Sequence, residues 1–390
     1  MNSARPLTIG IVAGEESGDL LGADVIAVIK ARTGRDVQLV GIGGRHLEAQ
    51  GLKPLFDAGD IALMGFSAVL RDLPRLVRRI GQTARAIVAA KPDCVLTIDS
   101  PDFTLRVAKK IRAADPFIPV IHYVCPSVWA WRPARAAAMK PHVDHVLCLL
   151  PFEPAELQRL GGPQGTFVGH RLTSDPGVLA AAAAQAVPHD FSTDRVKTLL
   201  LLPGSRRGEV SRLMEPFRET VSILKARGHR LRVVLPTVPH VAALVSKSVA
   251  GWQDMPEIVL DASAKWRAFG EADAALIASG TVALELALAG VPLVSCYKLD
   301  FLARAALRLI TVWSPLLPNL IADRPIAQEF YNELVRPPYM ARTIEQLFAD
   351  NDLRAWQKAG FAEVSRRMAT ARPSGDIAAD IILMAIGSRQ

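Results

Sequence analysis

The stretch AALIASGTVALE, residues 274–285, joins a short apolar run to a helical one through a turn of small polar residues. The run before the turn is apolar throughout, which is typical of a strand buried in a parallel sheet. Ser279, Gly280 and Thr281 then open a helical segment that continues to Gly290. A strand that leads directly into a helix is the repeating unit of α/β folds, so this stretch predicts one such unit.

The same unit recurs along both halves of the chain. In the first half, strands are predicted at residues 7–13, 38–41, 94–99, 120–124, 145–150 and 166–168. In the second half, they are predicted at 198–202, 231–235, 258–260, 274–278 and 293–296. Helical stretches separate most of these runs, which indicates parallel sheets with helices on both faces. The sequence therefore predicts an α/β fold of GT-B type, in which two Rossmann-like lobes face an interdomain cleft and a helical C-terminal tail follows.

The chain of 390 residues has room for two domains. The predicted boundaries are 1–171 for the N-terminal lobe, 172–197 for a hinge or linker, 198–340 for the C-terminal lobe and 341–390 for a helical tail. The linker is predicted from an Ala-rich run between Pro176 and Pro188. We expect the tail to pack back on the N-terminal lobe or on a partner subunit.

The composition of the chain indicates which kinds of ligand and partner it can bind. A net charge of +8 favours anionic ligands or an acidic membrane surface, and the sequence lacks the motifs of nucleic-acid-binding proteins. The four cysteines form no CxxC pair, so we expect buried, reduced thiols and no metal site. We find neither a signal peptide nor a run that could span a bilayer, and we expect a protein that is soluble or touches a membrane from one side.

Two loops of the C-terminal lobe suit a phosphate group. In the first, Gly204 lets the backbone approach a ligand, Ser205 offers a hydroxyl and Arg206 a guanidinium, just before a predicted helix. In the second, residues 279–281 open a helix whose free N–H groups suit a pyrophosphate. Glu285 follows on the same helix face, where it could accept both hydroxyls of a ribose. The alternative is a pair of capped turns in solvent.

The first loop of the N-terminal lobe is acidic. Its residues Glu15, Glu16 and Ser17 follow a strand, but the glycines around them do not make the G-x-G-x-x-G of a dinucleotide site. We therefore reject a nicotinamide cofactor and expect these side chains to bind hydroxyl groups of an acceptor. The alternative is that Gly18 and Gly22 only allow close packing of a helix on the sheet.

Four further residues of this lobe follow strands. Asp99 ends an apolar run, where a carboxylate could act as a general base or could form a turn. His170 ends another run just before the linker and is a second catalytic candidate. Trp129 and Trp131 lie in a Pro-rich loop that could face a sugar or an acyl chain, or could be a packed turn.

These motifs together resemble the lipid-A-disaccharide synthase family. The resemblance rests on the segments Gly14–Asp19, Ile98–Phe103, Pro126–Trp131, Leu202–Arg206, Ala278–Thr281 and Leu317–Asn319. They occur in the order of that family, up to about Asn332. The run PSVWAW is specific to it, whereas the Ser-Gly-Thr and Glu block is shared among GT-B enzymes. Three residues depart from the family pattern: Thr104 stands for Asn, Gln328 for Pro and Asn332 for Gln.

The resemblance implies an inverting glycosyltransferase. It would condense UDP-2,3-diacylglucosamine with 2,3-diacylglucosamine 1-phosphate (lipid X) to a β-1,6-linked disaccharide and UDP, without a metal or other cofactor. Asp99 would be the general base, Arg206 would bind the nucleotide phosphates, and Glu285 and Asn319 would bind UDP. The N-terminal lobe would hold the acceptor and the C-terminal lobe the UDP-sugar. The resemblance also implies a homodimer with exchanged C-terminal segments.

Two other functions fit parts of the pattern. A UDP-N-acetylglucosamine 2-epimerase shares the two lobes and the UDP block, but not the Trp-rich loop. A non-catalytic module that binds a nucleotide sugar or lipid would not need loops on both sides of the cleft.

A basic amphipathic stretch, together with the lipid substrates that the resemblance implies, predicts contact with the cytoplasmic face of the inner membrane. Its apolar residues follow helical spacing: Phe66, Val69, Leu70, Leu73, Leu76, Val77 and Ile80. Its basic residues lie on the opposite side: Arg71, Arg75, Arg78 and Arg79. Such a helix can lie on an anionic bilayer, or it can cover the sheet with its basic face in solvent. A second apolar and basic stretch spans residues 301–313.

Overall fold

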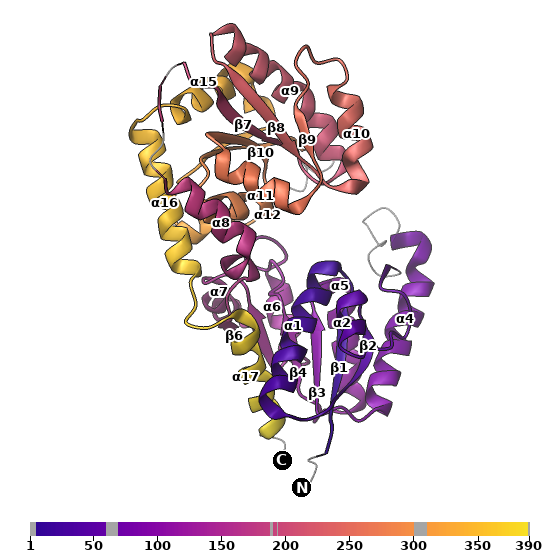
Figure 1. Ribbon diagram of the computed structural model, residues 1–390. Coiled ribbons are helices and arrows are strands. Elements are labelled where there is room, and N and C mark those ends of the chain that lie inside the picture. The colour runs from indigo at the N-terminus through magenta and orange to yellow at the C-terminus, as the bar shows by residue number, and fades with distance from the viewer. Residues whose placement is uncertain (1–4, 60–68, 188–189, 193, 300–309, 389–390) are drawn as a thin grey trace. The chain divides into compact units, whose positions relative to one another are not determined.

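The computed structural model describes residues 5–59, 69–187, 190–192, 194–299 and 310–388. The chain forms two compact units (Figure 1). Unit 1 comprises Met1–Arg171 with Thr370–Gln390, and unit 2 comprises Leu172–Ala369. Each unit contains a six-stranded sheet in which all neighbouring strands are parallel. The predicted α/β fold of GT-B type is therefore confirmed.

The sheet of unit 1 has the strand order β2-β1-β3-β4-β5-β6. Its strands are β1 Leu7–Ala13, β2 Val37–Ile42, β3 Cys94–Ile98, β4 Val120–Tyr123, β5 His145–Cys148 and β6 Gln164–Phe167. Its helices are α1 Glu16–Thr33, α2 Arg45–Ala49, α4 Val69–Ala89, α5 Pro101–Ala114, α6 Ala134–Met139, α7 Glu153–Arg159 and α17 Ser374–Gly387. A short 3₁₀ helix, Arg171–Ser174, follows β6.

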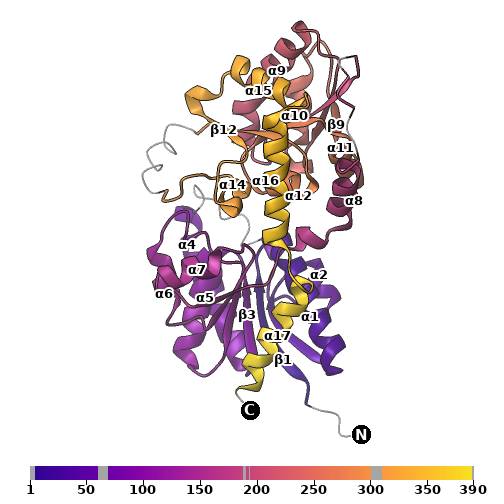
Figure 2. The same ribbon diagram turned by 90° about the vertical axis from the view of Figure 1, so that its left-hand side faces the viewer.

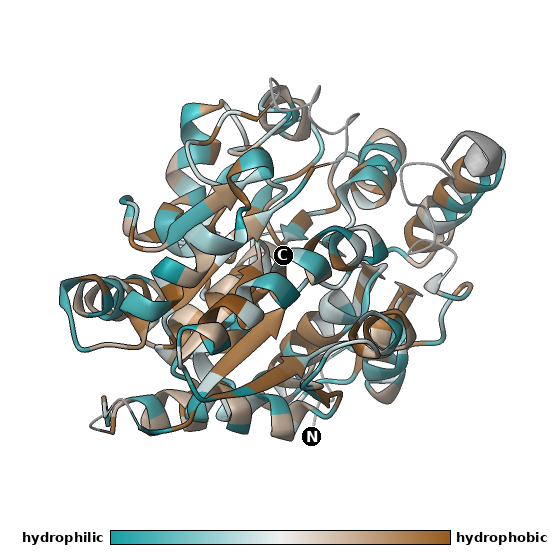
Figure 3. Cartoon of the chain, turned by 90° about the horizontal axis from the view of Figure 1, so that it is seen from above, coloured by the Kyte–Doolittle hydropathy of each residue, from teal (hydrophilic) through white to brown (hydrophobic). Residues whose placement is uncertain are grey.

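Alternate side chains of the unit 1 strands enter two apolar cores. On one face, Ile11 of β1 and Leu96 of β3 pack with buried residues of α1 and α17. On the other face, Val12 and Val95 pack with buried residues of α4 and α5. This alternation is the period of two that places helices on both faces of a parallel sheet. Figure 2 shows α17 beside this sheet, and Figure 3 colours the apolar residues of the chain brown.

The sheet of unit 2 has the order β12-β11-β10-β7-β8-β9. Its strands are β7 Lys197–Leu202, β8 Leu231–Pro236, β9 Glu257–Val259, β10 Ala274–Ala278, β11 Leu293–Tyr297 and β12 Gln328–Tyr331. Its helices are α8 Pro176–Gln185, α9 Arg207–Ala226, α10 Pro239–Val249, α11 Ala262–Glu271, α12 Thr281–Ala289, α14 Leu317–Ala322, α15 Pro337–Leu347 and α16 Asp352–Met368. A 3₁₀ helix, Asn332–Leu334, follows β12.

Each predicted strand falls on an observed one, but β12 was missed. The sequence of this strand is QEFY, and none of its residues is fully buried. It pairs with β11 alone at the edge of the sheet. An edge strand needs no continuous apolar run, so hydrophobic patterning did not reveal it.

The segment predicted as a linker belongs to unit 2. Residues 172–197 contain α8, which packs against α11 and α12. The side-chain amide of Gln185 donates hydrogen bonds to the carbonyls of Phe269, Gly270 and Ala272, at 3.0, 3.1 and 2.7 Å. These carbonyls end α11, so α8 is tied to the body of unit 2.

The predicted tail, residues 341–390, divides between the two units. Helices α15 and α16 pack in unit 2, where α16 lies beside α12 and α14 (Figure 2). The last helix, α17, packs against α1 in unit 1, and Ala378 and Ile382 are buried there. Within the described residues, no helix is both long enough and apolar enough to cross a membrane.

Candidate functional site

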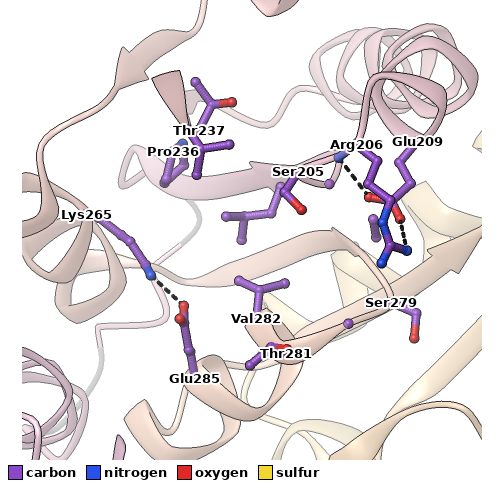
Figure 4. A pocket seen from close by; sticks show the side chains of 15 residues that line it. Ser205, Arg206, Glu209, Pro236, Thr237, Lys265, Ser279, Thr281, Val282 and Glu285 are labelled. Atoms are coloured by element: carbon purple, nitrogen blue, oxygen red, sulfur yellow. Dashed lines mark hydrogen bonds and ion pairs between the residues drawn. The ribbon is translucent and has the colours of Figure 1, made fainter. Parts of the chain in front are cut away.

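A cavity of about 330 Å³ opens in unit 2 beside the carboxyl ends of β7 and β10 (Figure 4). Its walls are the loops before α9 and α12, the end of β8 and one side chain of α11. Its lining residues are Leu202, Gly204, Ser205, Arg206, Glu209, Pro236, Thr237, Val238, Lys265, Ala278, Ser279, Gly280, Thr281, Val282 and Glu285. Open parallel sheets bind ligands at this edge. The cavity brings together every residue predicted to bind UDP except Asn319.

The loop before α9 has a backbone that only glycine fits. Gly204 has φ of 108°, and a Cβ there would lie 2.3 Å from Oε2 of Glu209. That carboxylate accepts the backbone N–H of Arg206 at 3.2 Å and contacts its guanidinium at 3.4 Å. The Arg206 side chain is 79% exposed, so its guanidinium can turn to an incoming anion. Arg206 also directly precedes the positive end of the α9 dipole.

The second loop delivers a helix end to the same cavity. Gly280 has φ of 154° and directly precedes α12, whose first residues Thr281 and Val282 line the wall. Ser279 is anchored by its backbone N–H, which donates to the carbonyl of Cys296 on β11 at 3.2 Å. Two helix N-termini therefore meet one cavity, an arrangement that favours a diphosphate.

Glu285 lies one turn further along α12 and meets a lysine that the sequence did not reveal. Its Oε2 forms an ion pair of 2.5 Å with Nζ of Lys265 on α11 (Figure 4). Glu209 was also missed as a functional residue. Lys265 belongs to no motif, because it comes from a different βα unit, while Glu209 is the third helical residue of α9 and forms a capping box with Arg206. Only the fold brings Lys265 to these loops, whereas Glu209 follows Arg206 by three residues at the start of α9.

Asn319 lies outside this cavity and is fully buried. Its Oδ1 accepts the backbone N–H groups of Ile326 and Ala327, each at 2.9 Å. Its Nδ2 donates to the carbonyl of Ala327 at 3.0 Å and to Glu329 at 3.2 Å. These bonds use the side chain to hold the turn between α14 and β12. In the structure, Asn319 therefore fixes the chain and does not line the cavity with the other predicted residues.

Asp99 lies at the carboxyl end of β3 in unit 1 in a strained turn. Asp99 and Ser100 have φ of 50° and 43°, a region that residues other than glycine seldom occupy. The carboxylate accepts the N–H of Ser100 at 2.8 Å, as a turn-forming aspartate would. Burial raises the pKa of Asp99 above its ordinary value. The departure Thr104 supports this turn, because its hydroxyl donates to the carbonyl of Asp99 at 2.6 Å.

The histidines of unit 1 differ in access. His122 is fully buried in β4, with Nδ1 2.9 Å from the hydroxyl of Thr97, so it cannot reach a substrate. His170 is partly buried just beyond β6, and burial lowers its pKa to about 4. The lowered pKa favours the neutral imidazole and makes it a weaker base than an exposed histidine.

The acidic loop of unit 1 lies at the start of α1, with Glu15, Glu16 and Ser17 exposed. Glu16 forms an ion pair of 2.5 Å with Arg45. The glycines behind this loop allow close packing: a Cβ on Gly18 or Gly22 would lie 3.2 or 2.8 Å from the side chain of Ile98. Gly18 and Gly22 therefore allow close packing of α1 on the sheet, while the side chains of residues 15–17 are exposed at the start of that helix.

The two loop tryptophans are held by different contacts. Trp129 stacks edge-on against Phe152 at 5.1 Å, and its indole N–H donates to Glu153 at 3.1 Å. Burial raises the pKa of Glu153 to about 7. Trp131 lies under the guanidinium of Arg132, 4.1 Å from its ring centroid. Both tryptophans are half-buried, so each keeps part of its ring exposed.

Three side chains of metal-ligating type lie together in unit 1, a cluster that the spacing of the cysteines in the sequence did not reveal. All four are buried and free, as expected, but Cys125, Cys148 and Glu153 lie with their ligand atoms within 4.8 Å of one another. Glu153 already accepts backbone N–H groups of Leu149 and Leu150, each at 3.0 Å, in addition to the Trp129 indole. Glu153 therefore holds the backbone at the end of β5 as well as the Trp129 ring.

The amphipathic stretch forms part of α4, although Phe66 and the side chains of residues 69–73 lie outside what the structure describes. Leu76 and Ile80 are buried in the core of unit 1, while Arg75, Val77 and Arg78 are exposed. Leu76 and Ile80, which were predicted to face a membrane, therefore cover the sheet, whereas Val77 of the same predicted side does not. Most of the second stretch, residues 300–309, is also outside the described part of the chain.

Comparison with known proteins identifies the family. The family model of lipid-A-disaccharide synthetase matches residues 9–373. Lipid-A-disaccharide synthase of Nitrobacter hamburgensis is 44% identical over 384 residues, which cover 98% of this chain and 96% of that protein. A relative of the same name in Rhodopseudomonas palustris is 45% identical over 376 residues, which cover 96% and 95%.

Solved structures share the fold at low identity. The UDP-GlcNAc 2-epimerase of Neisseria meningitidis bound to UDP-GlcNAc has a TM-score of 0.59 at 12% identity, and the match covers 98% of this chain and 100% of that one. The MurG protein of Acinetobacter baumannii has a TM-score of 0.57 at 15% identity, with 97% and 100% covered. These likenesses establish the two-lobed fold alone. The sequence matches go further, because they span nearly the whole chain, and by them the chain belongs to the lipid-A-disaccharide synthase family.

Proposed function

We propose that the chain transfers the sugar of UDP-2,3-diacylglucosamine to 2,3-diacylglucosamine 1-phosphate, giving a β-1,6-linked disaccharide 1-phosphate and UDP. The observation that carries this proposal is the cavity of unit 2, where Arg206, two helix N-termini and Glu285 meet. The guanidinium and the helix ends would bind the diphosphate, and the carboxylate would accept the ribose hydroxyls.

The reaction would be a single displacement with inversion. The 6-hydroxyl of the acceptor attacks the anomeric carbon as the bond from that carbon to the phosphate oxygen breaks. The electron pair leaves with UDP, whose growing charge Arg206 and the helix ends would stabilise. Asp99 would take the proton of the hydroxyl, and its raised pKa suits a base. His170 is the second candidate for that role. The acceptor would be contacted by Glu15, Glu16, Ser17, Trp129 and Trp131.

The alternative function, a UDP-N-acetylglucosamine 2-epimerase, differs from a transferase in the substrates that it needs. An epimerase acts on the UDP-sugar alone, whereas a transferase needs an acceptor. Incubation of the protein with the UDP-sugar in the absence of acceptor, followed by chromatography, separates the two. We expect the donor to be recovered unchanged, and a sugar inverted at C2 would instead support the epimerase.

The proposal includes peripheral binding to the cytoplasmic face of the inner membrane, because both substrates carry acyl chains. The exposed Arg75 and Arg78 of α4 support it, as do Ile310 and Trp313, which are exposed beside the second apolar stretch. A homodimer with exchanged C-terminal segments is also proposed. Helix α17 packs against α1, and the same helix of a second copy would fit the same position. Light scattering on the purified protein would test the dimer.

A further inference from the structure

The cavity of unit 2 holds two carboxylates, although its proposed ligand carries a diphosphate. Both Glu209 and Glu285 line it, and each meets a cation. The pairs differ in strength. Arg206 contacts Glu209 at 3.4 Å with a side chain that is 79% exposed, whereas Lys265 contacts Glu285 at 2.5 Å with side chains 26% and 17% exposed. Arg206 can therefore leave its partner for a phosphate, and Lys265 is held in place.

Aromatic contacts fix Lys265 further. Its ammonium lies 4.2 Å from the ring centroid of Trp266 and 5.5 Å from that of Phe269. These rings stack edge-on at 5.3 Å, and Phe269 is fully buried. The lysine thus stands on a rigid part of α11 and reaches across to α12, as Figure 4 shows. A cation held by a carboxylate and an aromatic face is fixed more firmly than a surface lysine.

We infer that Lys265 is a positioning residue, which orients Glu285 to accept the ribose hydroxyls of the donor nucleotide. The ammonium engages Oε2, so the lone pairs of Oε1 are available to hydroxyl donors. It also neutralises a carboxylate that would otherwise repel the neighbouring diphosphate. This inference rests on the proposed function, since it assumes a nucleoside diphosphate in the cavity.

The test is the preference for ribose over 2′-deoxyribose. Dissociation constants of UDP and 2′-deoxy-UDP would be measured by calorimetry for the wild type, Lys265→Met, Lys265→Arg and Glu285→Gln. The wild type should prefer UDP by about 10-fold, the scale of one hydrogen bond to a charged group. Lys265→Met should lose most of that preference and Lys265→Arg should retain it. When added to Glu285→Gln, Lys265→Met should change the preference no further. Lys225→Met is the matched control, because Lys225 pairs with Asp254 outside the cavity.

A Lys265→Met variant that weakens both nucleotides equally and keeps the ribose preference would overturn the inference. A wild type without ribose preference, or one that does not bind UDP, would instead contradict the proposed function. A Lys265→Met variant that does not fold is replaced by Lys265→Gln, judged by the same ratio. The ratio of two affinities is measured on folded protein, so a general loss of stability does not imitate the expected result.

Discussion

At the scale of single residues, the nucleotide site depends on a few charges. Arg206 is free to leave Glu209, and its guanidinium precedes the α9 dipole. We expect Arg206→Ala to weaken the binding of UDP by about 10-fold or more, since a charged hydrogen bond to phosphate contributes roughly 1.5–3 kcal/mol. Uridine, which lacks the phosphates, should bind almost as before. Arg212→Ala, further along α9, is the control, and equal losses for UDP and uridine would contradict the phosphate assignment.

Asp99 carries the second prediction at this scale. Asp99→Asn keeps the shape of the side chain and removes its basicity, so kcat should fall by at least about 10²-fold while UDP affinity hardly changes. Because burial raises the pKa of Asp99, the wild-type rate should rise with pH above the ordinary range of an aspartate. The Asp99→Asn variant should not show this rise of the rate with pH. A variant with near-wild-type kcat would transfer the role to His170.

The sequence predicted those residues of the cavity that lie in contiguous motifs better than those that come from other parts of the chain. The loops at Gly204–Arg206 and Ser279–Thr281 were found because strand, glycine and helix start follow one another in the chain. Lys265 reaches the cavity from another helix, and no spacing predicts such a meeting. Asn319 was grouped with the nucleotide residues by a motif, yet its hydrogen bonds hold a buried turn.

At the scale of elements, the loop before α9 must adopt one backbone shape. Gly204→Ala would add the cost of a positive φ and a collision with Glu209. Gly228 has φ of 92° but open space around it, so Gly228→Ala adds only the first cost. We expect roughly 1 kcal/mol of lost stability at Gly228 and roughly 2–3 kcal/mol at Gly204, from chemical denaturation. Equal losses of stability in Gly204→Ala and Gly228→Ala would show that the side chain of Glu209 can move away from the added Cβ at no energetic cost.

Helix α4 carries the prediction about the membrane. We expect Arg75→Ser with Arg78→Ser to reduce binding to anionic vesicles by roughly 30-fold, since each basic residue near such a surface contributes about 1 kcal/mol. Arg218→Ser with Arg342→Ser removes the same charge from exposed positions of unit 2 and serves as the control. Flotation of both variants with vesicles measures the effect, and equal binding of the α4 variant and the wild type would show that α4 is no membrane contact.

The elements that were predicted well are those with an unambiguous period. Buried parallel strands are apolar runs, and these were located to within a few residues. The edge strand β12 and the helix α8 have no clear hydrophobic period in the sequence. The residues of β12 are only partly buried, and most residues of α8 are alanines. Helix α4 was recognised as amphipathic, but patterning alone cannot say whether its apolar side covers a sheet or a bilayer.

At the scale of the whole molecule, the chain crosses from one unit to the other twice. It enters unit 2 at Leu172 and returns to unit 1 at Thr370. The sequence indicated the first crossing through the end of strand alternation. The second falls between two helices, α16 and α17, where no change of period marks it. Assignment of a helix to a unit depends on which sheet it covers, and that is decided by packing.

The most direct test of the account is the complete reaction. Purified protein would be mixed with UDP-2,3-diacylglucosamine and 2,3-diacylglucosamine 1-phosphate, and the products would be analysed by mass spectrometry and by the anomeric coupling in proton NMR. The account predicts UDP and a β-1,6-linked disaccharide 1-phosphate in equal amounts, formed only when both substrates are present. An α-linked product, or UDP released without any disaccharide, would contradict it.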